Sequence, residues 1–379
     1  MTSADPAAEA RDRFRRVAIT HEWLTVPGGS ELVVRHILDL FPEAEIFTSV
    51  YDREAMPEFR DHVVHTSFLD RVPGATRHYP RMLPLMDRAF RSFDLNAFDL
   101  VISSNHACAK NVTTPESTRH VCYCHTPMRY AWDPSFMSSE EVGPLARLAL
   151  PPMLAYLRRR DLAAAALPDA FVANSTVVRD RIRDFYGRDS VVIHPPVETE
   201  PLLKQPRAPG DYYLHLGRLV PYKRADLTVA ACAQLGRPLK VAGDGRALDS
   251  LRASAPPNVE FLGRVSDEQL RELLAGALAL VFPGEEDFGI VPVEAQAAGV
   301  PVIAYGRGGA TDSVVDGRTG LLFREQTPEG LVRAILAFED ATFDEAAIRD
   351  NARGFAPDRF RREFASFVVH GSQNGHTCR

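Results

Sequence analysis

Two basic residues in the second half of the chain have the types and spacing that a bound diphosphate needs. Arg218 and Lys223 stand in the segment HLGRLVPYKRAD, where a short apolar run ends at a glycine and a helical pattern begins soon after. Arginine offers phosphate a bidentate fork, lysine offers a mobile point charge, and the amides at a helix start add to the field. Taken alone, a solvated basic turn explains this segment equally well.

Two acidic residues follow in the segment FPGEEDFGIVPVEAQAAGVPVIA. Glu286 falls in a loop after a predicted strand, and Glu294 falls about one turn inside the next helix. We expect that helix to begin near Gly289 and Ile290, and amides at a helix start, here including that of Val291, can bind phosphate. The carboxylates can accept hydrogen bonds from sugar hydroxyls. The alternative, two solvated acids, fits poorly with so particular a pattern around them.

Glycines at two predicted strand ends allow a ligand or another backbone to approach closely. Gly243 lies in VAGDGRALDSL, and Gly28 and Gly29 precede a helix that we expect to begin at Ser30. The pair of glycines does not form a G-x-G-x-x-G sequence, so there is no dinucleotide fingerprint. A plain strand–helix turn with a serine N-cap remains the alternative for the pair.

Strands and helices alternate along the whole chain, which predicts a doubly wound α/β fold. Most predicted strands are continuous apolar runs, typical of a parallel sheet covered on both faces. The pattern restarts near residue 211, after a Pro-rich, charged segment (194–211) that we interpret as a linker. Two such domains would face each other across a cleft. The predicted divisions are a disordered tail (1–16), an N-terminal domain (17–200), a C-terminal domain (201–345) and closing helices that cross back (346–368).

Composition narrows the possible functions. The chain has 379 residues, 45% of them hydrophobic, and a net charge of −6, so no global positive field is available for nucleic acid. The five cysteines match no disulfide framework or zinc ribbon, and we interpret Cys122 and Cys124 as buried strand residues. No signal peptide and no apolar run of bilayer length is visible. We therefore expect a cytoplasmic protein.

Together these motifs resemble family 4 of the retaining glycosyltransferases, which have the GT-B fold. GRLVPYK resembles that family's diphosphate clamp, and EDFGIVPVE resembles its E-x7-E motif. The resemblance implies that Arg218 and Lys223 bind the donor diphosphate, that Glu286 contacts the donor sugar and that Glu294 binds the ribose. The amides that follow the Phe-Gly pair would hold phosphate or sugar oxygens.

The resemblance extends to the N-terminal half through CYCHTPMRYAWD. It implies that His125 lies near the transferred sugar, and the HTPMRYAWD form is similar to a subgroup of bacterial mannosyltransferases that act on phosphatidylinositol mannosides and polysaccharides. The acceptor-side residues would be Arg129, Tyr130, Trp132, Asn174 and Ser175. Lys110 would meet an anionic acceptor, although a solvated lysine is the close alternative.

The resemblance implies a retaining transfer by front-side attack, with the leaving diphosphate taking the acceptor proton. No cofactor or metal is expected, because cationic side chains replace magnesium. GDP-mannose is the favoured donor and a glycolipid or lipid-linked saccharide the favoured acceptor. A UDP-sugar hexosyl or N-acetylhexosaminyl transferase remains an alternative, and so does a nucleotide-sugar-binding protein without activity. Basic amphipathic stretches at 77–93 and 144–160 predict either peripheral membrane contact or ordinary covering helices.

Overall fold

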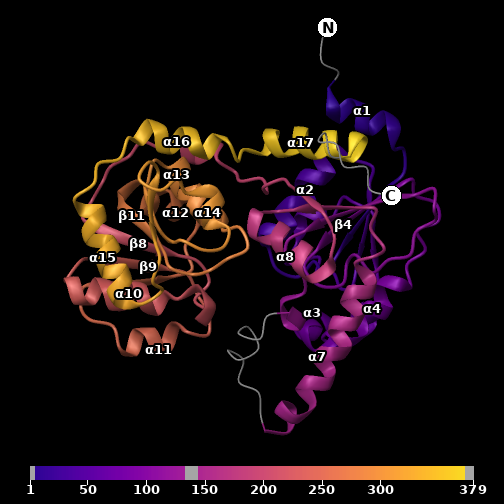
Figure 1. The fold of residues 1–379 in the computed structure, drawn as a ribbon, viewed down its shortest axis with the longest axis horizontal. Coiled ribbons are helices and arrows are strands. Elements are labelled where there is room, and N and C mark those ends of the chain that lie inside the picture. Colours follow the sequence, from indigo (N-terminus) through magenta and orange to yellow (C-terminus); the bar gives the residue numbers. More distant parts are fainter. Residues whose placement is uncertain (1–4, 133–143, 372–379) are drawn as a thin grey trace. The chain divides into compact units, whose positions relative to one another are not determined.

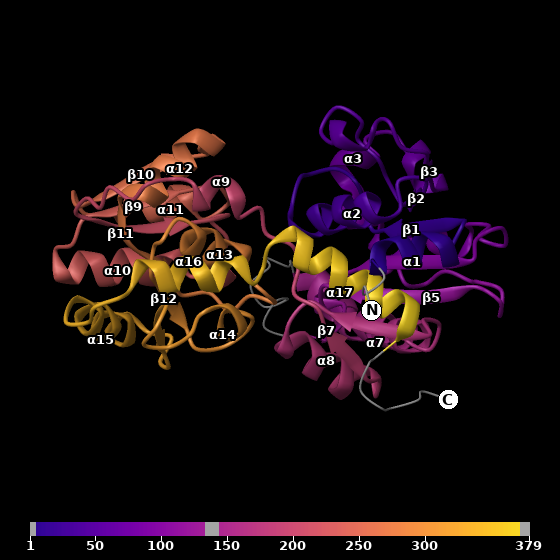
Figure 2. The ribbon, with the colours of Figure 1, turned by 90° about the horizontal axis from the view of Figure 1, so that it is seen from above.

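The computed structural model describes residues 5–132 and 144–371 of the chain, with the side chains of 144–150 left out. The chain divides into two compact units (Figures 1 and 2). Unit 1 comprises residues up to Pro196 together with those from Asp358 onward, and unit 2 comprises Val197–Pro357. Each unit has one sheet, in which every strand pairing is parallel. The predicted doubly wound α/β class is confirmed.

The sheet of unit 1 changes direction of winding between β1 and β4. Its order is β3 (Val64–Thr66), β2 (Glu45–Thr48), β1 (Val17–His21), β4 (Leu100–Asn105), β5 (Arg119–Cys124), β6 (Ala170–Ala173) and β7 (Ser190–Val192). The helices are α1 (Pro6–Arg13), α2 (Gly29–Leu40), α3 (Ala75–His78), α4 (Leu83–Arg91), α5 (Arg129–Trp132), α7 (Pro144–Ala164), α8 (Thr176–Tyr186) and α17 (Pro357–His370), with short 3₁₀ turns η1 (Pro57–Phe59), η2 (Phe68–Arg71) and η3 (Tyr79–Met82). Ligands of such sheets bind at the strand carboxyl ends beside this reversal.

The sheet of unit 2 reverses between β8 and β11. Its order is β10 (Val259–Gly263), β9 (Leu239–Ala242), β8 (Tyr212–Leu216), β11 (Ala277–Phe282), β12 (Val302–Tyr305) and β13 (Gly320–Phe323). The helices are α9 (Glu200–Leu203), η4 (Pro221–Lys223), α10 (Ala225–Leu235), α11 (Leu248–Ala253), α12 (Asp267–Gly276), α13 (Ile290–Ala297), α14 (Ala310–Ser313), α15 (Pro328–Glu339) and α16 (Glu345–Arg353). The segments that follow β8 and β11 are those that carry the four charged residues of the predicted site.

Local sequence explains where these elements begin and end. The β4 segment LVISSN is buried at every position, as expected for a central parallel strand covered on both faces. Helix α8 begins at Ser175, whose side chain accepts from the Val178 amide, and ends at Gly187 in the left-handed conformation. Helix α12 has a reciprocal capping box between Ser266 and Gln269. Caps of this kind hold the loops at the sheet edge in register.

The prediction of a disordered tail over 1–16 was wrong for its described part. Residues Pro6–Arg13 form α1, capped by Asp5, and Ala10 and Phe14 are buried in the core of unit 1. Residues 1–4 lie outside the described residues. The linker predicted over 194–211 was also too long, because Val197 and Leu202 are buried in the core of unit 2. Two strands, β3 and β13, were not predicted from the sequence.

The closing helices divide between the two units. Helix α16 belongs to unit 2, whereas α17 from Asp358 onward belongs to unit 1, as the predicted crossing requires. Phe360 and Phe364 of α17 are fully buried against Tyr123 of β5. Phe355, Phe360, Phe364 and Phe367 of these closing helices and their connection are all buried. Cys122 and Cys124 are likewise buried in β5.

Candidate functional site

Lys223 and Glu286 form an ion pair at the carboxyl edge of the unit 2 sheet. Lys223 ends η4 after β8, Glu286 lies in the loop after β11, and their Nζ and Oε1 atoms are 2.8 Å apart. Both side chains are largely buried, with 13% and 17% of their surface exposed. Within the described part of the chain, no group makes a hydrogen bond of good geometry to Glu286 Oε1. A buried carboxylate oxygen with unused accepting capacity is suited to a ligand hydroxyl.

Arg218 lies beside this pair and faces outward. It follows Gly217 at the end of β8 and is exposed, with a long 3.5 Å contact from its Nη2 to the Tyr222 hydroxyl. A Cβ placed on Gly217 would lie 3.4 Å from Lys223 Nζ, so the lysine ammonium lies against the backbone next to Arg218. The structure therefore brings both predicted cations to one loop and leaves the guanidinium available for an anion.

The start of α13 lies in the same loop region as Glu286. Gly289 precedes the helix with φ 83°, a conformation that favours glycine, and no side chain caps the helix. Ile290 and Val291 are half-buried in its first turn. Uncapped first-turn amides leave N–H donors directed at whatever occupies the helix start. The predicted amide N–H groups are therefore placed where they can donate hydrogen bonds to a phosphate or sugar oxygen.

Glu294 has an altered acidity. Burial and the charge of Asp267 raise the pKa of Glu294 to about 7, against the opposing charge of Lys223. The opposing effect of Lys223 means that Glu294 lies within electrostatic reach of the Lys223–Glu286 pair. Near neutral pH this carboxyl is present in both protonation states, so it can donate as well as accept a hydrogen bond.

The raised pKa predicts that Glu294→Gln stabilises the chain as pH rises. A carboxyl whose pKa is raised in the folded state destabilises the fold when it ionises. This loss of stability is absent below pH 4.5, the usual carboxyl pKa, grows as the pH rises to about 7 and is constant at higher pH. The variant should match the wild-type melting temperature near pH 4.5 and exceed it by a few degrees at pH 8. Thermal melts at both pH values measure this.

Glu339→Gln is the matched control with the opposite sign. Hydrogen bonding from Arg237 lowers the pKa of Glu339, so this variant should lose stability above the ordinary carboxyl pKa. A Glu294→Gln melting difference that stays constant from pH 4.5 to 8 would contradict the assigned acidity.

Gly243 packs its backbone against that of Gly217. Its φ is 137°, and a Cβ at this position would lie 1.9 Å from the Gly217 carbonyl oxygen. The amide of Gly217 donates to the Ala242 carbonyl, and that of Leu219 donates to the Asp244 carbonyl. The role that the structure gives Gly243 is close packing of the two loops, which holds the segment bearing Arg218.

His125 lies at the carboxyl end of β5 in unit 1, among other histidines. Its Nε2 is 2.9 Å from Ser104 Oγ of β4, and its backbone amide donates to the Asn105 carbonyl. Burial, together with the neighbouring His106 and His21, lowers the pKa of His125 to about 3. His125 is thus neutral at physiological pH. The sequence analysis did not predict that His21 and Glu31 lie near His125. The pattern that could have indicated it is a histidine at the end of β1, followed by a glutamate in the first turn of α2.

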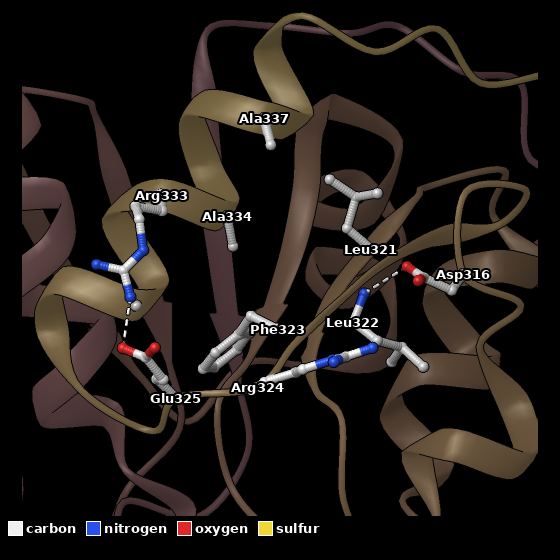
Figure 3. A pocket seen from close by; sticks show the side chains of 10 residues that line it. Asp316, Leu321, Leu322, Phe323, Arg324, Glu325, Arg333, Ala334 and Ala337 are labelled. Carbon is white, nitrogen blue, oxygen red and sulfur yellow. Dashed lines mark hydrogen bonds and ion pairs between the residues drawn. The ribbon is translucent and has the colours of Figure 1, made fainter.

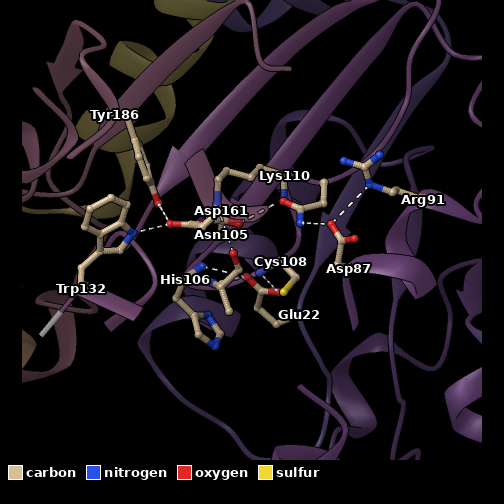
Figure 4. A network of polar contacts seen from close by, with 12 residues as sticks. Glu22, Asp87, Arg91, Asn105, His106, Cys108, Lys110, Trp132, Asp161 and Tyr186 are labelled. Atoms are coloured by element: carbon tan, nitrogen blue, oxygen red, sulfur yellow. Dashed lines mark hydrogen bonds and ion pairs between the residues drawn. The ribbon is translucent and has the colours of Figure 1, made fainter. Parts of the chain in front are cut away.

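The prediction that Lys110 meets an acceptor was wrong. Lys110 is fully buried, forms an ion pair with Asp161 and donates to the Ala107 carbonyl (Figure 4). Burial lowers the pKa of Lys110, but the Asp161 carboxylate outweighs it, so the lysine stays charged. Lys110 therefore points into unit 1, where it is an internal structural cation.

Trp132 shares the same buried carboxylate. Its indole Nε1 donates to Asp161 Oδ2 at 2.7 Å, and the Tyr186 hydroxyl donates to that oxygen at 2.7 Å (Figure 4). The Trp132 ring also stacks on Phe185. Glu22 completes the network by accepting three amides, those of His106, Ala107 and Cys108. This network fixes the loop after β4 and the end of α5.

The remaining predicted residues of unit 1 lie along the same sheet edge. Asn174 and Ser175 follow β6 and are buried; Ser175 caps α8 and donates to Asn174 Oδ1. Arg129 and Tyr130 are half-buried in α5. Gly28 and Gly29 begin α2, and a Cβ on Gly28 would lie 2.9 Å from Glu31 Oε2.

A cavity of about 360 Å³ lies elsewhere in unit 2, between β13 and α15 (Figure 3). Arg333 and Glu325, which form an ion pair, lie at one side, and Asp316 accepts the Leu322 amide at the other. None of the predicted site residues lines this cavity.

The described residues contain no group of three or more His, Cys, Asp or Glu side chains that could hold a metal ion. Among the helices of the described segments, none combines the length and apolarity needed to cross a membrane.

Comparison with known proteins identifies both units. Residues 27–201 match the family described as Glycosyltransferase Family 4, and residues 204–355 match Glycosyl transferases group 1. Two parallel-sheet domains with these matches define the class of GT-B glycosyltransferases. One of these two glycosyltransferase models thus matches most of each unit.

Individual relatives agree with this class. An uncharacterized glycosyltransferase of Methanocaldococcus jannaschii is 28% identical over 195 residues, which are 50% of this chain and 54% of that protein. A D-inositol 3-phosphate glycosyltransferase of Streptomyces avermitilis is 43% identical over 83 residues, 22% of this chain and 18% of the relative. The chain thus spans about half the length, or less, of these curated relatives.

A solved structure has the same fold over nearly the whole chain. Anabaena HepE, in complex with UDP and glucose, has a TM-score of 0.67 and 18% identity, covering 93% of this chain and 99% of HepE. At that identity the likeness shows the fold alone.

Proposed function

We propose that the chain is a retaining glycosyltransferase that moves a hexose from a nucleotide-diphosphate sugar to an acceptor hydroxyl. The observation that carries this proposal is the largely buried Lys223–Glu286 ion pair at the reversal of the unit 2 sheet, in which Glu286 Oε1 faces Lys223 Nζ and has no further partner among the described residues. A cation paired with a carboxylate can exchange that partner for a phosphate, which frees the carboxylate for a sugar hydroxyl. The family matches of both units support the same assignment.

Each residue of unit 2 then has a separate task. Arg218 and Lys223 stabilise the charge that develops on the leaving diphosphate, which takes the acceptor proton in a front-side attack. Glu286 contacts the transferred sugar and Glu294 the ribose, and the amides of Ile290 and Val291 receive phosphate or sugar oxygens. Positioning and charge stabilisation supply the rate, so the proposed reaction requires neither metal nor cofactor.

The donor that we favour is GDP-mannose, with His125 near the mannose. The HTPMRYAWD segment supports this choice through its similarity to bacterial mannosyltransferases. A UDP sugar is the second candidate, and the observation that favours it is that HepE, with the same fold, was solved with UDP-glucose.

A thermal-shift panel tests the donor base. We expect GDP and GDP-mannose to raise the melting temperature more than UDP and UDP-glucose at equal concentration, both with and without EDTA. A ligand at 100 times its Kd stabilises by about 2.7 kcal/mol, which such melts resolve. A larger shift from the uridine nucleotides would reject GDP-mannose, and shifts that vanish with EDTA would reject metal-independent binding.

A transfer assay separates the enzyme from a nucleotide-sugar-binding protein. An enzyme releases the nucleoside diphosphate in stoichiometric amounts when an acceptor is added, whereas a binding protein shows only the thermal shift. Stabilisation by a nucleotide sugar without release of diphosphate to any acceptor or to water would favour the binding protein.

The acceptor that we favour is a glycolipid, such as a phosphatidylinositol mannoside, or a lipid-linked saccharide, at the inner face of the plasma membrane. Leu85 of α4 and Tyr156 of α7 are about half exposed, at 51% and 50%. The same two helices carry exposed arginines, and an Arg160–Asp87 ion pair joins them. Apolar side chains among arginines suit an anionic lipid surface. The similarity to a D-inositol 3-phosphate glycosyltransferase is compatible with an inositol-containing acceptor.

Membrane contact predicts co-sedimentation with anionic vesicles at low salt. We expect binding to phosphatidylglycerol vesicles, weaker binding to phosphatidylcholine, and loss of binding in Leu85→Ser/Tyr156→Ser. Exchanging Leu336 of unit 2, exposed at 43%, for Ser is the control that should leave binding unchanged. Equal sedimentation with both lipids would contradict the proposed surface.

A further inference from the structure

A continuous line of hydrogen bonds joins an acid at the start of α2 to His125. Glu31 Oε1 is 3.2 Å from His21 Nε2, His21 Nδ1 is 3.1 Å from Ser104 Oγ, and Ser104 Oγ is 2.9 Å from His125 Nε2. His21 and Ser104 are fully buried, and Glu31 is 5% exposed. The line crosses from α2 through β1 to β4 and β5, at the reversal of the unit 1 sheet.

The acid end of the line is ionised. Burial raises the pKa of Glu31, but the hydrogen bonds of His21 and Ser30 outweigh it and lower the pKa to about 2. The Ser30 hydroxyl donates to the second oxygen, Oε2, at 2.8 Å. Both carboxylate oxygens therefore only accept, and His21 must present a hydrogen on Nε2.

A His21 ring with a single hydrogen transmits this direction along the line. With its hydrogen on Nε2, its Nδ1 can only accept, so the Ser104 hydroxyl donates to it. The Ser104 oxygen is then left to accept from His125 Nε2. The direction of each hydrogen bond fixes the direction of the next, because each group has only one hydrogen that it can donate to its neighbours in the line.

We propose that Glu31 is a positioning residue that, through His21 and Ser104, holds His125 as the Nε2–H tautomer with a bare Nδ1. Among the described residues, none is hydrogen-bonded to Nδ1 of His125. A bare Nδ1 accepts a hydrogen bond from a hydroxyl and donates none. On the proposed function, His125 therefore orients a hydroxyl of the donor sugar or the acceptor, and it does not deliver a proton to the leaving group.

If His21 carried hydrogens on both ring nitrogens, the direction of donation from His21 to His125 would reverse. His21 Nδ1–H would donate to Ser104, Ser104 would donate to His125 Nε2, and His125 would carry its hydrogen on Nδ1. The two directions therefore predict opposite tautomers for one ring, which nuclear magnetic resonance distinguishes.

The test is the ¹⁵N spectrum of the ligand-free, histidine-labelled chain at pH 8, with His125 assigned by its loss in His125→Gln. We expect a single Nε2–H tautomer for His125. In Glu31→Gln and Ser104→Ala the direction is no longer imposed, and the expected result is a mixture of both tautomers. A wild-type Nδ1–H tautomer, or an unchanged spectrum in both variants, would overturn the proposal.

Ser103→Ala is the matched control. Ser103 is the next residue of β4, equally buried, and its Oγ is 2.6 Å from Nε2 of another histidine, His120. Its loss should lower the melting temperature by a similar amount and leave the His125 tautomer unchanged. If Ser103→Ala also changed the His125 tautomer, the tautomer would depend on general core packing and not on the line of hydrogen bonds, and the proposal would be overturned.

Kinetics give the second readout. We expect Ser104→Ala and Glu31→Gln to lower kcat about 10- to 100-fold with the KM for the nucleotide sugar nearly unchanged. The spectra need no substrate, so they test the line even if the chain transfers no sugar. If the wild-type chain were inactive but gave the expected spectra, the proposed function would be contradicted and the positioning role of Glu31 would stand.

Discussion

Lys223→Ala is expected to lower kcat for sugar transfer about 100- to 1000-fold, the usual cost of removing one donor from developing charge. Lys223 is the largely buried cation of the site, and its loss leaves the Glu286 carboxylate without its partner. The loss also removes the opposing charge from Glu294, so the pKa of Glu294 rises further above its value of about 7. Steady-state transfer with saturating nucleotide sugar measures the change.

Lys204→Ala is the control for removing a lysine from unit 2. Lys204 pairs with Glu200 on the surface, where both side chains are more than 70% exposed, at 77% and 71%. Such a pair contributes little, so the control should keep its activity. If Lys223→Ala retained wild-type kcat, the diphosphate would have to be held elsewhere.

Gly243→Ala is expected to destabilise unit 2 by about 2–6 kcal/mol. The Cβ would overlap the Gly217 carbonyl oxygen at 1.9 Å, and the φ of 137° is one that L-residues rarely adopt. Overlap with backbone and backbone strain each cost about 1–3 kcal/mol. Because the displaced segment bears Arg218, nucleotide binding should fall with stability. Urea unfolding and the thermal shift with GDP measure the two effects.

Gly236→Ala isolates the backbone contribution. Gly236 has φ 63° and no heavy atom within 4 Å of an added Cβ. This control should cost about 1–2 kcal/mol and leave nucleotide binding intact. Equal losses in the two variants would show that strain, and not the contact with Gly217, explains the glycine at 243.

The sequence predicted the central strands of both sheets because they are continuous apolar runs between helical patterns. The two missed strands lie at sheet edges, where burial on both faces does not apply. β3 is only three residues long and partly exposed, and β13 follows glycine turns that masked its apolar residues. Helix α1 was missed because its composition is polar, and its few buried residues pack in a core shared with α17, more than 340 residues later.

The charged residues of unit 2 could be predicted because their motifs are short and contiguous. The line from Glu31 to His125 could not, since its four members come from separate elements that only the strand order brings together. Lys110 shows that a correctly predicted position along the chain does not fix where the side chain points. Its place after a strand end predicted exposure, but the direction of a side chain depends on a partner such as Asp161, 51 residues later.

The last helix of the chain has a consequence for biosynthesis. Phe360, Phe364 and Val368 of α17 are fully buried in the same core as β1 and α2, and Arg13 donates to the Val369 carbonyl. The half of the protein that leaves the ribosome first is therefore the half completed last. Until α17 has been translated, the nascent core of unit 1 exposes apolar surface. Unit 2, whose residues end at Pro357, does not share this surface, and chaperones would bind to it.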